Sequence, residues 1–189
     1  SSGTTSSTYA TPTSTNQLFI LDEMMNVTGA ILDIAPGEQI YSTRFMGERG
    51  YMVTYKDVDP LYVLDLADPT NPAILGELKI PGYSTYLHPY QEGYLIGFGK
   101  DSVELVNQWD PTTKWAYYQG LKVALFDVRD VASPKLLHET HIGDRGTDSE
   151  LLRNHRALLF SPTRNLMAFP VSLYEVPVGE DALISYALH

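Results

Sequence analysis

The sequence predicts an all-β fold in which four-stranded antiparallel units repeat, as the blades of a β-propeller do. Residues 18–54 align with residues 61–97 at an offset of 43 positions, and a third copy of the pattern follows from Asp127 onward. Short apolar segments alternate with turns rich in Gly, Pro, Asn and Asp, which is typical of strands and tight connections. The 13 tyrosines and many branched residues also favour strands.

Composition allows one sizeable core and excludes several classes of function. The 189 residues are 43% hydrophobic, and the net charge of −10 argues against nucleic-acid binding, which needs a basic surface. Cysteine is absent, so disulfides and thiolate metal sites are excluded. No apolar run approaches the ~20 residues of a membrane span, and no segment has the pattern of a signal peptide.

The chain begins with a segment, residues 1–16, composed mostly of Ser, Thr, Gly and Pro, which predicts a linker or tail. The first repeat is expected at about residues 17–59. The second is expected at about residues 60–120, with an insertion at 101–120. Its predicted strands are Leu61–Leu66, Ala73–Ile80, Ser84–Tyr90 and Tyr94–Gly99.

The third repeat is expected at about residues 121–181, with a second insertion around 143–150. Residues 182–188 are expected to start a further strand. Because a propeller usually needs 4–8 blades, these roughly three repeats predict a partial or open propeller whose sheet edges offer a route to self-association. The predicted strands are Leu121–Val128, Lys135–Ile142, Asn154–Phe160 and Leu166–Val171.

Two resemblances to known proteins support the prediction of a β-propeller. The segment Leu61–Pro72, LYVLDLADPTNP, resembles the strand and turn of propeller repeats that are distantly related to WD repeats. Longer stretches resemble the secreted bacterial and archaeal β-propeller domain proteins; they are residues 44–101, 120–135, 142–150 and 154–160. The resemblance implies a propeller fold and an extracellular or cell-surface location, and it carries no established reaction. The chain is shorter than a whole domain of that family.

The resemblance also implies an order of strands within one blade. Ser84–Tyr90 would be innermost, Tyr94–Gly99 and Leu121–Val128 would follow, and Lys135–Ile142 would be outermost. Residues 101–120 would then be a long excursion between the second and third strands.

Recurring polar residues are expected to have structural roles. The carboxylates at the ends of strands and in the turns can accept hydrogen bonds from turn amides; they are Asp65, Asp68, Asp127 and Asp130. His88 and His155 each open the inner hairpin of a repeat, where a histidine commonly bridges a strand to a loop.

The insertion at 143–150 is a candidate site for a cation or ligand. Asp144, Asp148 and Glu150 supply carboxylates of the kind that calcium prefers, although their spacing differs from an EF-hand loop. The competing interpretation is a polar loop in which Arg145 pairs with a carboxylate. No other cofactor is indicated.

The insertion at 101–120 is a candidate surface for a protein or carbohydrate ligand. Its aromatic residues can either stack on a partner or cover the open edge of the sheet; they are Trp109, Trp115, Tyr117 and Tyr118. Arg145 is included in the same candidate surface.

Sequence signatures of common enzymes are missing, among them the Gly-x-Ser-x-Gly elbow, the phosphate-binding loop and His-Glu-x-x-His. The sequence therefore favours a non-catalytic extracellular module for binding or scaffolding. Two alternatives stay open: a hydrolase or lyase acting on a polysaccharide or peptide in the propeller channel, and a calcium-stabilised structural domain.

Overall fold

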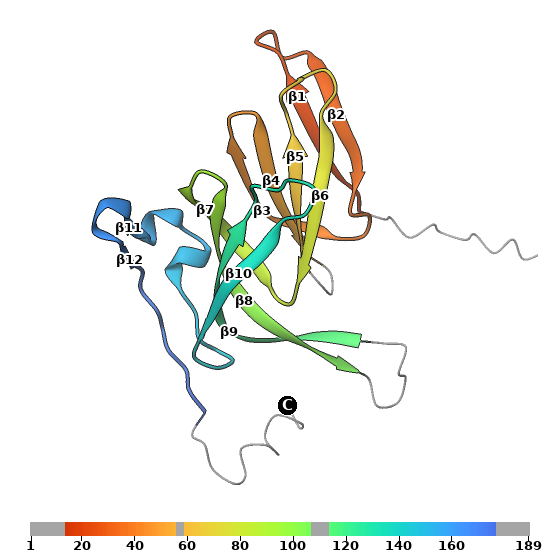
Figure 1. Ribbon diagram of the computed structural model, residues 1–189. Helices are drawn as coiled ribbons and strands as arrows, with labels where there is room; N and C mark the ends of the chain where they lie inside the picture. The colour runs from red at the N-terminus through yellow and green to blue at the C-terminus, as the bar shows by residue number, and fades with distance from the viewer. Residues whose placement is uncertain (1–13, 56–58, 107–113, 177–189) are drawn as a thin grey trace, which may run out of the picture.

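The described part of the molecule consists of two four-stranded antiparallel sheets with a two-stranded hairpin at each end (Figure 1). This computed structural model describes residues 14–55, 59–106 and 114–176. The array is open, and it confirms the predicted all-β class of four-stranded antiparallel units. Among the described residues, no helix has the length and apolar character needed to cross a membrane.

The first sheet has the order β3-β4-β5-β6 and the second has the order β10-β9-β8-β7. The strands of the first sheet are β3 (Gln39–Met46), β4 (Arg49–Tyr55), β5 (Asp59–Asp65) and β6 (Ala73–Ile80). Those of the second sheet are β7 (Tyr83–Gln91), β8 (Tyr94–Val106), β9 (Lys114–Asp127) and β10 (Lys135–Ile142). The hairpins are β1 (Asn16–Leu21) with β2 (Val27–Ile34), and β11 (Leu159–Ser161) with β12 (Leu166–Ala168).

The order of strands in the second sheet is the one that the resemblance predicted, with β7 at one edge and β10 at the other. The first strands of the two sheets lie together, and the Ser42 hydroxyl on β3 donates a 2.8 Å hydrogen bond to the Ser84 carbonyl on β7. The sheets do not coincide with the repeats seen in the sequence. They span residues 39–80 and 83–142, so each sheet takes strands from two successive repeats.

The main core lies between the two sheets, where apolar side chains alternate along the strands and face one another. Val63 on β5 and Leu95 on β8 are both fully buried there. Smaller cores join the β1–β2 hairpin to the first sheet through Ile34, Met52 and Leu64, and join the C-terminal segment to the second sheet through Ile96, Phe98 and Leu151. The two sheets therefore behave as consecutive layers, each with an apolar face toward the next.

One predicted strand is wrong. Residues 154–160 begin as the 3₁₀ turn η2 (His155–Ala157), which follows a first turn, η1 (Glu150–Leu152), and only then enter β11. Polar side chains compete for the backbone here: Ser149 accepts a hydrogen bond from the Leu151 amide and Asn154 accepts one from the Arg156 amide, each at 3.2 Å. The strand predicted at Leu166–Val171 is shorter, ending at Ala168. A third turn, η3 (Pro162–Arg164), joins β11 to β12.

Candidate functional site

The insertion at 101–120 is an extension of two strands of the second sheet. Beyond a register shift between Lys100 and Ser102, β8 and β9 continue their antiparallel pairing as a two-stranded arm, from Ser102 opposite Tyr118 to Val106 opposite Lys114. In Figure 1 this arm projects away from both sheets. Trp109 lies outside the described residues, and Trp115 is described only by its backbone pairing with Leu105.

Tyrosine rings hold the base of this arm against the two sheets. The Tyr118 ring meets the Tyr83 ring edge-on with centroids 5.3 Å apart, and its centroid is 5.9 Å from that of Tyr55. Tyr41 extends the cluster, with its ring centroid 4.7 Å from that of Tyr83. Such ring pairs add stabilisation beyond area burial. This aromatic cluster fixes the direction in which the arm leaves the sheet.

The two insertions that the sequence singled out meet in space. The guanidinium carbon of Arg145, from the 143–150 loop, lies 4.2 Å from the centroid of the Tyr117 ring on the arm. This cation–π geometry brings together two residues of the predicted ligand surface. Arg145 is paired with this ring, and the described structure shows no ion pair between it and a carboxylate.

One face of the arm is apolar and open to solvent. Val103 and Leu105 are 44% and 42% exposed, and the two-residue period of a strand places them on the same side. Val103 is directly opposite Tyr117 in the pairing register, so the Tyr117–Arg145 pair continues the same face. We call this set, Val103, Leu105, Tyr117 and Arg145, the arm face.

The 143–150 loop is fastened to the segment at residues 170–176. The buried Thr147 hydroxyl donates to the Tyr174 carbonyl and accepts from the Tyr174 amide, both at 2.9 Å. Asp148 and Ser172 exchange backbone hydrogen bonds of 2.9 and 2.8 Å. These contacts give the loop that carries Arg145 a defined position.

The three carboxylates of the loop each have a partner within the chain. An Asp144 oxygen accepts from the Val176 amide at 2.7 Å, and Asp148 accepts from the Arg153 guanidinium at 2.8 Å. Glu150 lies 3.9 Å from the same guanidinium. Burial opposes ionisation of Asp148, but the Arg153 hydrogen bond and other favourable contacts outweigh it, so the pKa is lowered. Sequence reasoning missed Arg153 because it lies beyond the loop.

No group of three or more metal-binding side chains occurs among the residues that the structure describes. Asp144 accepts from the Val176 amide, whereas Asp148 and Glu150 both face the Arg153 guanidinium. The calcium site stays a prediction.

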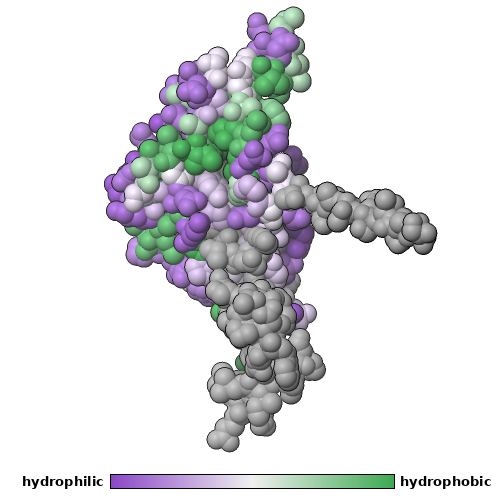
Figure 2. All heavy atoms as spheres, turned by 90° about the vertical axis from the view of Figure 1, so that its right-hand side faces the viewer, coloured by the Kyte–Doolittle hydropathy of each residue, from purple (hydrophilic) through white to green (hydrophobic). Residues whose placement is uncertain are grey.

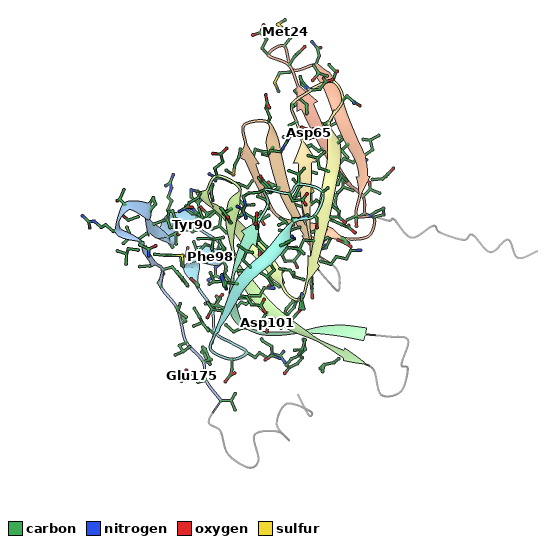
Figure 3. The ribbon with its side chains drawn as sticks, viewed as in Figure 1. Met24, Asp65, Tyr90, Phe98, Asp101 and Glu175 are labelled. Carbon is green, nitrogen blue, oxygen red and sulfur yellow. The ribbon has the colours of Figure 1, made fainter. Side chains whose placement is uncertain are left out.

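The recurring aspartates accept hydrogen bonds from turn amides. Asp65 Oδ1 accepts from the Ala67 amide at 3.2 Å and from the Arg49 guanidinium, Asp68 accepts from the Thr70 amide at 2.9 Å, and Asp127 accepts from the Arg129 amide at 3.0 Å. Asp130 contributes its carbonyl, which accepts from the Ser133 amide. In Figure 3, Asp65 lies in the upper part of the ribbon, far from Asp101 at the base of the arm.

His88 and His155 both contact the same tyrosine, Tyr86. The Tyr86 hydroxyl and His88 Nδ1 share a 2.9 Å hydrogen bond, and the His155 ring stacks on the Tyr86 ring with centroids 6.1 Å apart. Burial, and to a lesser degree the charge of Arg44, lowers the pKa of His88. The inner hairpin of the second sheet thus meets the turn at η2 through ring contacts, and a bridging hydrogen bond from either histidine stays a prediction.

Two shallow grooves lie between the second sheet and the β11–β12 hairpin. They have volumes of about 270 and 220 Å³ and share Tyr90, Ile96 and Met167 in their walls. Tyr90 and Phe98 mark this region in Figure 3. The walls of both grooves are largely apolar.

Successive four-stranded antiparallel sheets that lie layer upon layer, each joined by its first strand to the next, define a protein of the β-propeller class. The chain belongs to the Beta propeller domain family, whose model matches residues 3–187. This confirms the resemblance to β-propeller domain proteins seen in the sequence.

Relatives of the chain occur in archaea and are uncharacterised. An uncharacterised protein of Methanocaldococcus jannaschii is 48% identical over 122 residues, which are 64% of this chain and 17% of the relative. One from Archaeoglobus fulgidus is 37% identical over 155 residues, which are 82% of this chain and 22% of the relative. The chain thus spans about a fifth of the length of these relatives. No solved structure matches it.

Proposed function

We propose that the chain is a non-catalytic propeller module that binds a protein partner through the arm face. The observation that carries this proposal is the contact between Arg145 and Tyr117, which joins the two insertions into one surface. Insertions in repeat proteins commonly carry the binding face, because the repeated strands are already used to form the core.

The shape of the arm favours a protein as the partner. It projects from the sheets as a ribbon and presents exposed Val103 and Leu105 beside an aromatic–arginine pair. Protein interfaces are enriched in aromatic residues and arginine, and these residues carry a large share of the binding energy. Small ligands, in contrast, are usually enclosed in concave sites. A rigidly anchored ribbon loses little entropy when a partner docks on it.

We further propose that the module acts outside the cell or at its surface. Support for this location comes from the resemblance to secreted propeller proteins. The binding surface itself does not depend on the location.

The test is a selection of peptides from a random displayed library on the immobilised chain, followed by affinity measurements on variants. Tyr117→Ala and the double variant Val103→Ser, Leu105→Ser are expected to weaken selected peptides at least about tenfold, which corresponds to ~1.4 kcal/mol. The matched control is Leu137→Ser, an exposed apolar residue on β10.

Peptides that bind the Tyr117→Ala variant and the parent chain equally would contradict the proposal. Turnover of a polysaccharide or peptide by the purified chain would contradict its non-catalytic part. A third outcome is that the chain binds an oligosaccharide and no peptide, and that the same variants lose this binding. The arm face would then be a carbohydrate-binding surface, and the assignment of a protein partner would be overturned.

A further inference from the structure

The β1–β2 hairpin corresponds to the outer half of a blade. At the offset of 43 positions, β1 aligns with β5 and β2 with β6, the two outer strands of the first sheet. Asp22 takes the place of Asp65, and in both turns the carboxylate accepts from the amide two residues on. The inner pair that β4 and β3 supply to β5 has no counterpart beside β1 among the described residues.

The β11–β12 hairpin corresponds to the inner half of a blade. It follows β10 in the chain, as β7 and β8 follow β6. Both hairpins have a residue of positive φ directly before the second strand, Gly93 at 76° before β8 and Asn165 at 49° before β12. The edge of β12 that has no partner strand among the described residues is therefore the equivalent of the β8 edge that pairs with β9.

One face of β1 is exposed, whereas the same face of the aligned strands β5 and β9 is buried against a neighbouring layer. Leu21 is 48% exposed, whereas the aligned residues Leu64 and Phe126 are 0% and 1% exposed. Phe19, on the same side of the strand, is 51% exposed. The opposite side, with Leu18, already packs on the first sheet. In Figure 2 hydrophobic patches interrupt the hydrophilic surface on the side of the molecule that faces the viewer.

In the part of the chain that the structure describes, the second sheet lacks a matching cover beside β12. Val123 and Leu125 line the groove of about 270 Å³, whereas the aligned residues of the first sheet, Leu61 and Val63, are buried against the second sheet. Met167 on β12 also lines this groove. A strand paired with β12 would therefore place alternate side chains over the groove.

We propose that the β1–β2 hairpin of a second copy of this chain pairs with β12 and completes a four-stranded blade. The register follows from the complete sheets, in which Asp65 is opposite Arg49 and Asp127 is opposite Tyr94. It places Asp22 of the second copy opposite Leu166, and Leu21 opposite Met167. Leu21 and Phe19 of that copy then cover the groove on the second sheet.

The number of strands agrees with a closed ring. Among the described residues, each copy has two complete sheets, one outer half and one inner half. The described strands of two copies joined at both ends would form six blades, within the 4–8 blades of known propellers. The interface is separate from the arm face, so variants of one surface leave the other intact.

Two other occupants are possible for the open edge. Residues 182–188 match the sequence of a single strand, whereas the incomplete blade lacks two strands in the part of the chain that the structure describes. Further repeats of a longer polypeptide could also supply them, since the relatives are roughly four times as long as the chain: 122 residues are 17% of one and 155 residues are 22% of the other. The β1–β2 hairpin supplies both strands with their turn, and it carries an uncovered face that fits the uncovered groove.

The register is tested by cross-linking, because the chain has no cysteine of its own. Leu21→Cys and Met167→Cys are prepared as separate single variants, mixed and mildly oxidised. Directly opposite residues in an antiparallel pair have Cα atoms ~4.5–5.5 Å apart, which suits a disulfide. We expect a disulfide-linked dimer of one variant with the other. The matched control replaces Leu21→Cys with Met24→Cys, at the exposed tip of the same hairpin (Figure 3).

The mass of the unlinked chain gives the second measurement. Native mass spectrometry is expected to show twice the 21.1 kDa of one chain, and Leu21→Asp should restore the single mass while Met24→Asp does not. A chain that stays monomeric, or a dimer that resists Leu21→Asp, would overturn the proposal. A monomer whose β12 amides lose exchange protection when residues 177–189 are removed would overturn it too, by assigning the edge to those residues.

Discussion

An aspartate stands at the end of β5, at the end of β9 and directly after β1, the strand that aligns with β5. Each of these aspartates accepts a hydrogen bond from the amide two residues further on. Asp22 accepts from the Met24 amide at 2.8 Å, and Asp127 from the Arg129 amide at 3.0 Å. A short carboxylate side chain can do this because it folds over the turn that follows it and reaches the amide two residues on. Asp127 is also held by the Arg129 side chain, with bonds of 3.0 and 2.6 Å.

Asp127→Asn is expected to remove a pH-dependent contribution to stability. Hydrogen bonds from the Arg129 side chain and amide lower the pKa of Asp127 to about 2. A carboxylate with a lowered pKa stabilises the fold above its ordinary pKa, and this contribution is lost as the pH falls through the folded value. Melting temperatures of the parent chain should therefore fall between about pH 4 and 2 by more than those of the variant.

Asp130→Asn is the control for this measurement, because its carboxylate makes no hydrogen bond in the described structure. Parallel melting curves for the parent chain and Asp127→Asn across that pH window would contradict the assignment.

Strand β8 depends on glycine for its close approach to β7. The segment Gly97-Phe98-Gly99 is a weak match to a nucleotide-binding loop in the sequence, but it lies in the middle of a strand. A Cβ atom on Gly97 would lie 2.5 Å from the Ser84 hydroxyl, and one on Gly99 would overlap the Tyr83 carbonyl. These glycines are therefore needed for strand packing.

Gly99→Ala is expected to destabilise the fold by about 1–3 kcal/mol, because the added methyl group meets rigid backbone. Urea unfolding followed by tyrosine fluorescence measures the change. Gly50→Ala is the matched control, since its added Cβ would lie 3.2 Å from the Phe45 ring, which can shift. Equal losses in the two variants would show that backbone crowding is not the cause.

At the scale of the whole molecule, the two sheets share one core. Val63 and Leu61 come from the first sheet, and Leu95 and Phe126 from the second, and all four are nearly or fully buried in the same cluster. Each sheet alone would expose this face to water. The two sheets are therefore expected to unfold together.

Leu95→Ala should cost about 2–5 kcal/mol, the usual range for a large-to-small change at a fully buried site. In urea the variant should keep a single unfolding transition at a lower midpoint. Leu137→Ala, on the exposed side of β10, should change the midpoint little. Two separate transitions in the parent chain would contradict a shared core.

The sequence predicted much of the fold because its repeats carry the strand pattern directly. The bounds of β6 and β10 and the strand order of the second sheet agree with the prediction. Residues 154–160 were predicted wrongly, since local side-chain caps at Ser149 and Asn154 outweigh the strand pattern there. The arm was predicted as an insertion, but its two strands were not. Their pairing depends on the register that β8 and β9 adopt beyond Lys100, which local sequence does not specify.

The sequence by itself determined the class of fold, the repeated turn aspartates and the two insertions, because each of these is set by local spacing and residue type. Only the tertiary structure decided that Arg145 lies on Tyr117, and that Leu21 is uncovered while Leu64 and Phe126 are buried. The physical reason is that these features depend on which strands pair across layers. Residues with the same local pattern differ in burial when one blade is complete and the next is only half formed.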